Sequence, residues 1–222
     1  LTFGRDLIIP KPVDPRLITA VSPAVAKAAM DSGIAQAPIT DWDQYKRRLE
    51  MRLGNDSTFS RNIATRAARA PKRVVFAEAE RYKVLKAAEM AMDEGIAHPI
   101  LLGRRHRIEA LIEENNLELD GATILDARAV DQEERRKAFG KVFFERRKRH
   151  GLTALEAERY MRKRNYFGSM LVDQGEADAL VSGLTRNYPN VIRPALHSIG
   201  KAKGVDKVAG MYILQTKNGP MF

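Results

Sequence analysis

Three short stretches of the sequence carry side chains that could do chemistry. Glu78 and Glu80 follow an apolar run and could form a carboxylate pair of the kind used in acid–base catalysis. Residues 103–106 (Gly-Arg-Arg-His) place positive charge at a glycine and could form a phosphate loop. Residues 182–188 (Ser-Gly-Leu-Thr-Arg-Asn-Tyr) form another glycine loop, which could hold a phosphate or an acetyl group.

Two of these stretches have a simpler interpretation that we favour. Acidic residues after a strand often begin the next helix, where the macrodipole stabilises them, so Glu78 and Glu80 are expected there. Residues 103–106 lack a Gly-x-Gly-x-x-Gly or Walker pattern and are interpreted as a turn between a strand and a helix. The loop 182–188 follows a predicted strand of an open α/β sheet, which is where such folds bind ligands.

The elements that must position these residues alternate between strand and helix from Lys72 onward. Apolar runs typical of buried strands lie at residues 74–77, 99–103, 122–125 and 177–183. Apolar residues at helical spacing lie between and after them, at residues 84–92, 108–112, 139–143, 157–173 and 192–199. Repeated units of this kind predict an α/β fold, a three-layer αβα open, mainly parallel sheet.

The chain before Lys72 has a different character. A helix is predicted from Ser22, as N-cap, to Gly33, and a second, connecting helix from Asp41. Residues 54–71 are polar and are interpreted as a linker.

Both ends of the chain are expected to be cut from a longer protein. Residues 207–216 are predicted to form a strand, and Lys217-Asn218-Gly219 predicts a tight hairpin. Only three residues follow, to Phe222, and the chain begins with Leu1 rather than Met. The sheet is therefore expected to be incomplete.

Composition narrows the function classes. The 222 residues are 44% hydrophobic, enough to bury a core. The chain has no cysteine and its four histidines show no paired ligand spacing, so neither a disulfide nor a metal site is predicted. No apolar run approaches the roughly 20 residues that cross a membrane, and no signal pattern opens the chain. We expect a cytoplasmic protein with no membrane partner.

The net charge of +10 raises nucleic acid as a partner. The excess positive charge lies at residues 61–73 and 135–164, where charges alternate with apolar positions along predicted helices. A solvated helix face is the commoner meaning of that pattern. We therefore expect no nucleic-acid partner.

Two groups of motifs resemble the bacterial hybrid malic enzymes, in which a malic enzyme is fused to a phosphotransacetylase-like domain. The segments 1–17 and 24–33 resemble the end of the malic-enzyme portion. Phosphotransacetylase-type motifs cover most of the remainder, at residues 72–78 (Lys-Arg-Val-Val-Phe-Ala-Glu), 165–172 (Asn-Tyr-Phe-Gly-Ser-Met-Leu-Val), 175–183 (Gly-Glu-Ala-Asp-Ala-Leu-Val-Ser-Gly) and 192–196 (Ile-Arg-Pro-Ala-Leu).

The resemblance implies a domain plan and a function. Residues 1–53 would be the tail of the malic-enzyme domain with a connector helix, residues 54–71 a linker, and residues 72–222 a truncated phosphotransacetylase-like domain of isocitrate-dehydrogenase-like type. The parent would be an NADP-dependent, oxaloacetate-decarboxylating malic enzyme that converts malate to pyruvate and carbon dioxide. This chain would be its regulatory and oligomerising part.

Matching positions imply an acetyl-CoA effector site. Arg147 and Arg193 match two arginines associated with coenzyme A, whose phosphates a guanidinium fork can hold. Thr185, Arg186 and Tyr188 in the neighbouring loop complete the expected site. Active phosphotransacetylases usually carry a His-Ser-Thr-like segment where this chain has Arg-Asn-Tyr at 186–188, which argues against the alternative function of phosphate acetyltransferase.

The resemblance places no catalytic residue in this chain. The catalytic Lys and Tyr, the metal carboxylates and the NADP-binding glycines of a malic enzyme would lie before Leu1, so NADP and Mg or Mn would bind outside the chain. The transacetylase Ser and Asp would lie beyond Phe222. A homo-oligomer is implied, and aromatic positions such as Phe143, Tyr160 and Phe167 suit either an interface or a core.

Overall fold

The computed structural model describes residues 16–52, 58–216 and 219–221. The described helices are α1 (Arg16–Asp31), α2 (Trp42–Arg52), α3 (Thr58–Ala68), α4 (Tyr82–Asp93), α5 (Arg105–Glu114), α6 (Glu133–Arg147), α7 (Ala154–Tyr160), α8 (Arg164–Asp173) and α9 (Tyr188–Ser198). The strands are β1 (Lys72–Phe76), β2 (Ala97–Leu102), β3 (Thr123–Leu125), β4 (Ala179–Val181), β5 (Leu214–Thr216) and β6 (Gly219–Met221). The chain divides into two compact units, residues 61–210 and residues 1–60 with 211–222.

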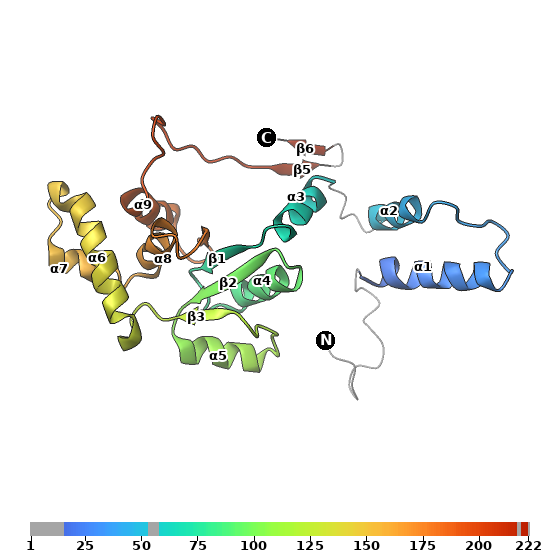
Figure 1. Cartoon of the computed structure of the whole chain (residues 1–222), viewed down its shortest axis with the longest axis horizontal. Coiled ribbons are helices and arrows are strands. Elements are labelled where there is room, and N and C mark those ends of the chain that lie inside the picture. The colour runs from blue at the N-terminus through green and yellow to red at the C-terminus, as the bar shows by residue number, and fades with distance from the viewer. Residues whose placement is uncertain (1–15, 53–57, 217–218, 222) are drawn as a thin grey trace. The chain divides into compact units, whose positions relative to one another are not determined.

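The larger unit is built on a parallel four-stranded sheet in the order β3-β2-β1-β4 (Figure 1). Val75 of β1 lies opposite Ile100 of β2 and Leu180 of β4, and all three strand pairs of this sheet are parallel. The chain adds β2 and β3 on one side of β1 and then returns to place β4 on the other. The predicted parallel α/β sheet is confirmed.

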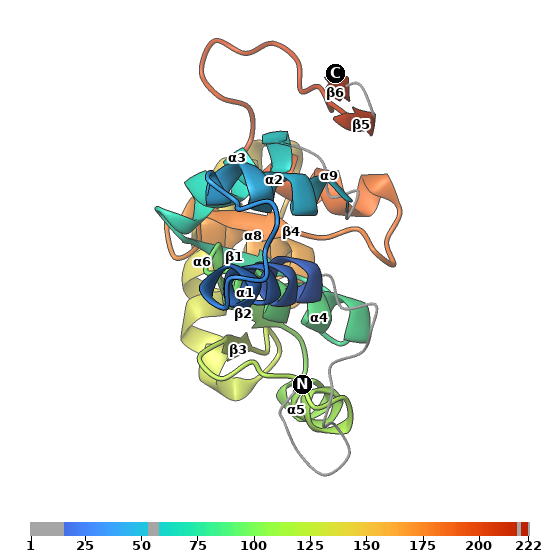
Figure 2. The same ribbon diagram turned by 90° about the vertical axis from the view of Figure 1, so that its right-hand side faces the viewer.

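Alternate residues of the strands face two separate cores. Val75 and Leu102 pack with α6, α7 and α8 on one face, whereas Phe76 and Leu101 pack with α4 and α5 on the other. Figure 2 accordingly shows the strands of this sheet between α6 and α4. Side chains on successive residues of a strand point to opposite faces, so one apolar run supplies both cores of the predicted three-layer fold.

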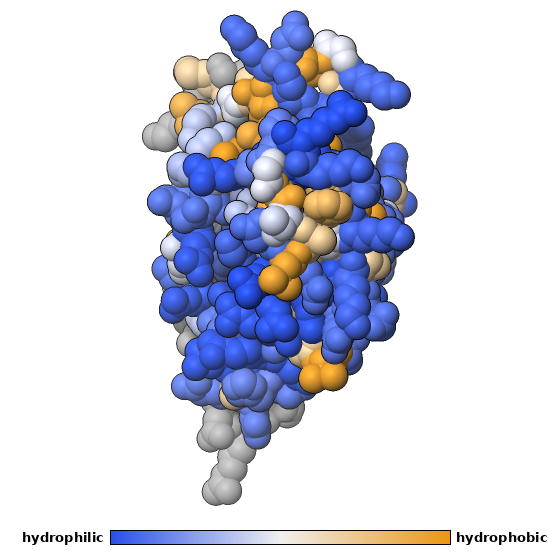
Figure 3. Space-filling view, turned by 90° about the vertical axis from the view of Figure 1, so that its left-hand side faces the viewer, coloured by the Kyte–Doolittle hydropathy of each residue, from blue (hydrophilic) through white to orange (hydrophobic). Residues whose placement is uncertain are grey.

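The aromatic residues expected at an interface or in a core lie in the core. Phe143 and Phe167 are fully buried in the first core, and Tyr160 packs against it. By contrast, most charged side chains of α6 lie on the surface, where Lys137 pairs with Glu133 and Glu134. The exception is Arg136, which is buried and donates to the carbonyls of Ala127 and Ala129. The face of the molecule on the left of Figure 1 is mostly hydrophilic (Figure 3), so this part of the basic segment is a solvated helix face.

Three predicted elements differ from the observed ones. The helical pattern at 157–173 is divided between α7 and α8, because α8 enters the layer beside the sheet while α7 packs on α6. Ser22 is not an N-cap, because α1 already runs from Arg16 and contains Pro23. The segment 54–71, expected as a linker, carries α3, whose alanines favour a helix; residues 53–57 lie outside the described residues.

The predicted start of α2 and the predicted C-terminal hairpin agree with the structure, apart from the length of the first strand. Asp41 caps α2, its carboxylate accepting a hydrogen bond of 2.8 Å from the Gln44 amide. The predicted hairpin is confirmed as the antiparallel pair β5–β6, with its two loop residues outside the described residues. The first strand covers Leu214–Thr216 rather than 207–216, because residues 207–213 have no strand partner in the described chain.

Gly168 sets how closely α8 approaches the sheet. A Cβ at this position would lie 2.8 Å from Leu180 Cδ1, 3.2 Å from Leu102 Cδ1 and 3.3 Å from Val75 Cγ1. We expect Gly168→Ala to lower the free energy of unfolding by about 1–3 kcal/mol, because the added methyl group would crowd Leu102 and Val75, which are fully buried. Gly210→Ala, where nothing lies within 4 Å of the added Cβ, is the control for chemical denaturation. Equal stabilities of the two variants would contradict the expectation.

Candidate anion-binding site

The site lies at the carboxyl ends of the parallel strands, around the place where the strand order reverses. β1 is followed by the turn that carries Glu78 and Glu80, and β4, its neighbour in the sheet, is followed by the loop 182–188. Open α/β sheets leave a crevice at such a reversal, because successive connections leave the sheet in opposite directions. The topology therefore brings together segments that are about 105 residues apart in the sequence.

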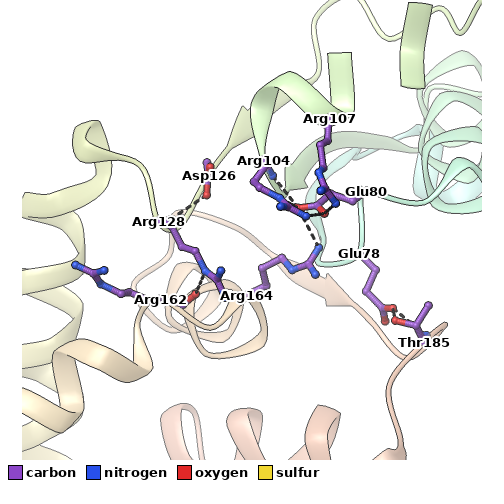
Figure 4. Close-up of polar contacts among 9 residues, drawn as sticks. All are labelled: Glu78, Glu80, Arg104, Arg107, Asp126, Arg128, Arg162, Arg164 and Thr185. Carbon is purple, nitrogen blue, oxygen red and sulfur yellow. Dashed lines mark hydrogen bonds and ion pairs between the residues drawn. The ribbon is translucent and has the colours of Figure 1, made fainter. Parts of the chain in front are cut away.

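The Glu78 carboxylate holds the loop after β4. It accepts hydrogen bonds from the backbone amides of Gly183 (2.8 Å), Leu184 (3.0 Å) and Thr185 (2.8 Å), and from the Thr185 hydroxyl (Figure 4). The Ser182 hydroxyl adds a longer contact of 3.4 Å. Gly183 has φ of +122°, a backbone conformation that glycine adopts without strain, so its residue type permits this turn.

Glu78 remains charged although its side chain is 5% exposed. Burial raises the pKa of its carboxyl group, but the hydrogen bonds from Thr185, Gly183 and Leu184 outweigh that effect and lower the pKa below 4.5. The loop's amides are thereby occupied. The expectation that this loop cradles a phosphate needs correction, because an internal carboxylate already fills that position.

Glu80 turns away from Glu78, toward a group of arginines (Figure 4). Arg104 binds it with two side-chain hydrogen bonds, of 2.8 and 3.2 Å, and with its backbone amide. The Arg104 side chain is the main reason that the pKa of Glu80 falls to about 2, against the opposing effect of burial. Glu78 and Glu80 thus form neither a catalytic pair nor the first turn of α4, and our interpretation of them as helix-starting residues was wrong.

A cavity of about 460 Å³ opens beside this turn. Six of its lining residues are cationic and none is Asp or Glu; the cations are Arg128, Arg162, Lys163, Arg164, Arg186 and Arg193. The other lining residues include Tyr160, Tyr166, Asn165, Asn190 and His197. This volume is typical of a small-molecule site, and the charge selects an anion.

Two helix N-termini add to the positive potential of the cavity. α8 and α9 both begin on its wall, neither has an acidic residue in its first turn, and no side chain caps either start. Backbone N–H groups at a helix start are free to bind an anion. Asn165 ties the two starts together, its amide donating to the Asn190 carbonyl at 2.9 Å and its oxygen accepting from Ser182 at 3.0 Å.

One wall of the cavity is aromatic. The Tyr166 hydroxyl lies 3.1 Å from His197 Nδ1, and the Tyr160 and Tyr166 rings are 4.6 Å apart. Burial lowers the pKa of His197, and the positive charges of Arg147 and Arg193 lower it further. His197 is therefore neutral at pH 7, and its ring can accept or donate a hydrogen bond without adding charge.

The structure brings together part of the predicted site. Arg186 and Arg193 line the cavity, whereas Thr185 is held by Glu78 and Tyr188 is 69% exposed. Arg147 does not line the cavity, but its charge acts on Tyr166 and His197.

Residues 162–164 were counted in the basic segment 135–164 but were not predicted to belong to the site. The helical pattern of the sequence continues through these residues, so it does not predict that a new helix, α8, begins at Arg164. The signal that could have found them is the run of three cationic residues at 162–164, just before the apolar stretch of α8.

The described residues contain no group of three or more His, Asp or Glu side chains placed to hold a metal ion. None of the described helices is long and apolar enough to cross a membrane.

Comparisons with known proteins agree with the fold. The protein-family model for phosphate acetyl/butaryl transferase matches residues 58–222. An NADP-dependent malic enzyme from Haemophilus influenzae is 39% identical over 100% of this chain and 29% of its own length. A phosphate acetyltransferase from Helicobacter pylori is 35% identical over 70% of this chain and 30% of its own.

Solved structures give the same result. A phosphotransacetylase from Streptococcus pyogenes is 30% identical, with a TM-score of 0.59, over 67% of this chain and 44% of that one. A phosphotransacetylase from Staphylococcus aureus is 27% identical, with a TM-score of 0.61, over 72% and 48%. The chain thus spans less than half the length of each of these relatives.

Glu78→Gln tests the carboxylate that holds the loop. We expect it to lower the free energy of unfolding by about 2 kcal/mol or more, because an amide nitrogen would face hydrogen-bond donors. Hydrogen exchange should lose protection at the amides of residues 183–185. Glu118→Gln, at an exposed side chain, is the control.

The same pair of variants predicts a pH dependence. The lowered pKa of Glu78 contributes stability that is present above about pH 4.5 and lost as the pH falls through the folded-state value. Stability should therefore fall more steeply on acidification in the Glu118→Gln protein than in the Glu78→Gln protein. Parallel curves would contradict the assignment.

Proposed function

Since this chain belongs to the phosphate acetyl/butaryl transferase family, we propose that it is the phosphotransacetylase-like part of a bacterial NADP-dependent malic enzyme. The support is the extent of the similarity. Malic enzymes match the whole chain, including residues 1–57 before the family match begins, whereas the phosphate acetyltransferases match about 70% of it. The shared segment before residue 58 favours a malic-enzyme parent.

In this proposal the parent oxidatively decarboxylates malate to pyruvate and carbon dioxide. The chain spans 29% of the length of the malic enzymes it matches. NADP and the Mg or Mn ion would bind outside this chain, since its described residues have no cluster for a metal. The chain would contribute regulation and homo-oligomer contacts in the cytoplasm.

The observation that carries the regulatory proposal is the cavity with six cations and no carboxylate. Acetyl-CoA carries several phosphate charges and a long chain with apolar parts. Arg186 and Arg193 would bind phosphate oxygens through their guanidinium groups, with Arg147 supplying charge from behind. Thr185 would keep the loop in place through Glu78, and the exposed Tyr188 would border the ligand at the start of α9.

Regulation requires more than binding. Acetyl-CoA would change malate oxidation only if it binds one global state of the oligomer more tightly than another. A downstream product of pyruvate would then act as a feedback effector.

Arg193→Ala tests the binding site. We expect acetyl-CoA to bind this variant about ten- to a hundredfold more weakly, because a charge-assisted hydrogen bond to phosphate is lost. Calorimetric titration of the chain measures this change, and Arg149→Ala, at an exposed residue outside the cavity, is the control. The site assignment fails if both variants bind as the wild type does.

The complete enzyme tests the function. Malate oxidation should be inhibited by acetyl-CoA, and Arg193→Ala should relieve the inhibition without changing the rate in its absence. An enzyme that acetyl-CoA does not affect, or a variant that is still fully inhibited, would count against regulation at this cavity.

The second candidate function is phosphate acetyltransferase, which the family match and the named transferase relatives favour. It requires transfer of an acetyl group between coenzyme A and phosphate. Direct assay of acetyl phosphate formation by the complete protein separates the two functions. We expect no turnover, because residues 186–188 depart from the segment usual in active transferases.

A further inference from the structure

The main cavity, the one of about 460 Å³ at the starts of α8 and α9, has a single histidine among its lining residues, His197. Six of the other lining residues are cationic, and none is Asp or Glu. Histidine is the side chain whose charge ordinarily changes between about pH 5 and pH 8. Protonation of His197 would therefore add one more positive charge to a wall whose charge already selects an anion.

Tyr166 allows His197 to exist in either charge state. The Tyr166 hydroxyl lies 3.1 Å from His197 Nδ1. A hydroxyl can donate to the ring nitrogen when the nitrogen is bare and accept from it when the nitrogen carries a proton, so neither state leaves the pair unsatisfied. Burial raises the pKa of Tyr166 above its usual 10, so the hydroxyl keeps its own proton while His197 titrates.

The charges that act on His197 favour its neutral form. Arg193 lies one helical turn before it on α9, Arg147 is the last residue of α6, and His150 lies in the turn that follows α6. Burial lowers the pKa of His197 most, followed by the positive charges of Arg147, Arg193 and His150. The free protein therefore keeps a neutral group at the place where cations surround it.

The other neighbours do not supply a negative charge to His197. Arg146 of α6 donates to the Ser198 carbonyl and is paired with Asp173 at 2.6 Å, so the carboxylate is already neutralised by an arginine. Tyr160 of α7 contributes an aromatic ring, which lies 4.6 Å from the Tyr166 ring. An anion that enters the cavity would be the first negative charge there without a partner.

Such an anion would oppose the field that keeps His197 neutral. Its charge would lie among the same cations and would offset their effect, so a proton that is unfavourable in the free protein becomes favourable in the complex. We propose that anion binding in the main cavity is coupled to the uptake of one proton from solvent by His197, so that the site senses pH together with its ligand. With acetyl-CoA as the ligand the inference rests on the proposed function, whereas with a simple anion it rests on the cavity alone.

The coupling fixes the sign of the pH dependence. Because the lowered pKa of His197 keeps it neutral at pH 7 in the free protein, anion affinity should be constant at high pH and rise as the pH falls. The rise ends once His197 is protonated in the free protein as well. Linkage is reciprocal, so the gain in anion affinity equals the gain in proton affinity of His197.

The first test uses sulfate, which keeps its double charge throughout this range, and is made on the wild type. Nuclear magnetic resonance of the full chain with labelled histidines follows the titration of His197 in saturating sodium sulfate and in sodium chloride of equal ionic strength, with His197→Gln to assign the signal. Sulfate should raise the pKa of His197 and leave the titration of His106, an exposed residue outside the cavity, unchanged. An unchanged titration of His197 overturns the proposal.

The second test compares the acetyl-CoA affinity of the wild type, His197→Gln and His106→Gln from about pH 8 to about pH 5.5, by calorimetric titration. The phosphate monoester of the ligand, with a second pKa of about 6, loses charge over this range and weakens binding to all three proteins alike. Relative to His197→Gln, the wild type and His106→Gln should gain about tenfold in affinity on acidification.

The outcomes separate the coupling from the proposed function. If all three proteins bind acetyl-CoA with the same pH dependence, the coupling is overturned and the effector site stands. If sulfate raises the pKa of His197 but none of the proteins binds acetyl-CoA, the coupling stands and the proposed function fails.

Discussion

The site depends on the interaction between the Glu78 carboxylate and the loop after β4. Parallel strands cannot be joined by a tight turn, so β1 and β4 pair only after the chain has passed through β2, β3 and the helices between them. Glu78 links the segments that follow these two strands, because its buried carboxylate accepts hydrogen bonds from three consecutive amides and a hydroxyl of the loop after β4. Arg186 follows directly after the last of these amides, and its place on the cavity wall is a consequence of that anchor.

The two acidic residues in the turn after β1, Glu78 and Glu80, bind different groups. Glu78 satisfies backbone donors, and Glu80 compensates only part of an arginine cluster. Neither carboxylate lines the main cavity, and of its six cationic residues only Arg164 forms an ion pair among the described residues, with Glu80. Like charges held close together cost free energy that the fold must offset elsewhere, and an anionic ligand would remove that cost. Buried aromatic packing under Tyr166 helps to hold the two helix starts in position despite this repulsion.

Local patterns allowed the sheet to be predicted, whereas the contacts of the site could not be. Apolar runs such as the one ending at Phe76 identify buried strands by themselves, and their alternation with helices predicts a parallel sheet. The role of Glu78 depends on amides about 105 residues away, which no local pattern contains, so the macrodipole argument gave the wrong answer. The start of α8 was missed because the helical period continues through it, although α7 ends at Tyr160 and α8 begins only at Arg164. Arg193 was found through resemblance, and it lies in the middle of α9 rather than at a helix start.

The use of the loop amides by Glu78 bears on which function the domain can have. Acyl and phosphoryl transfer use fixed donors aimed at the charge that develops in the transition state. At residues 183–185, the three amides and the Thr185 hydroxyl already bind an internal carboxylate whose lowered pKa keeps it charged. The described residues therefore offer an anion mainly the arginines and helix starts of α8 and α9. Groups of that kind bind the oxygens of an anionic ligand, whereas the three loop amides and the Thr185 hydroxyl have no free donor left for a developing charge.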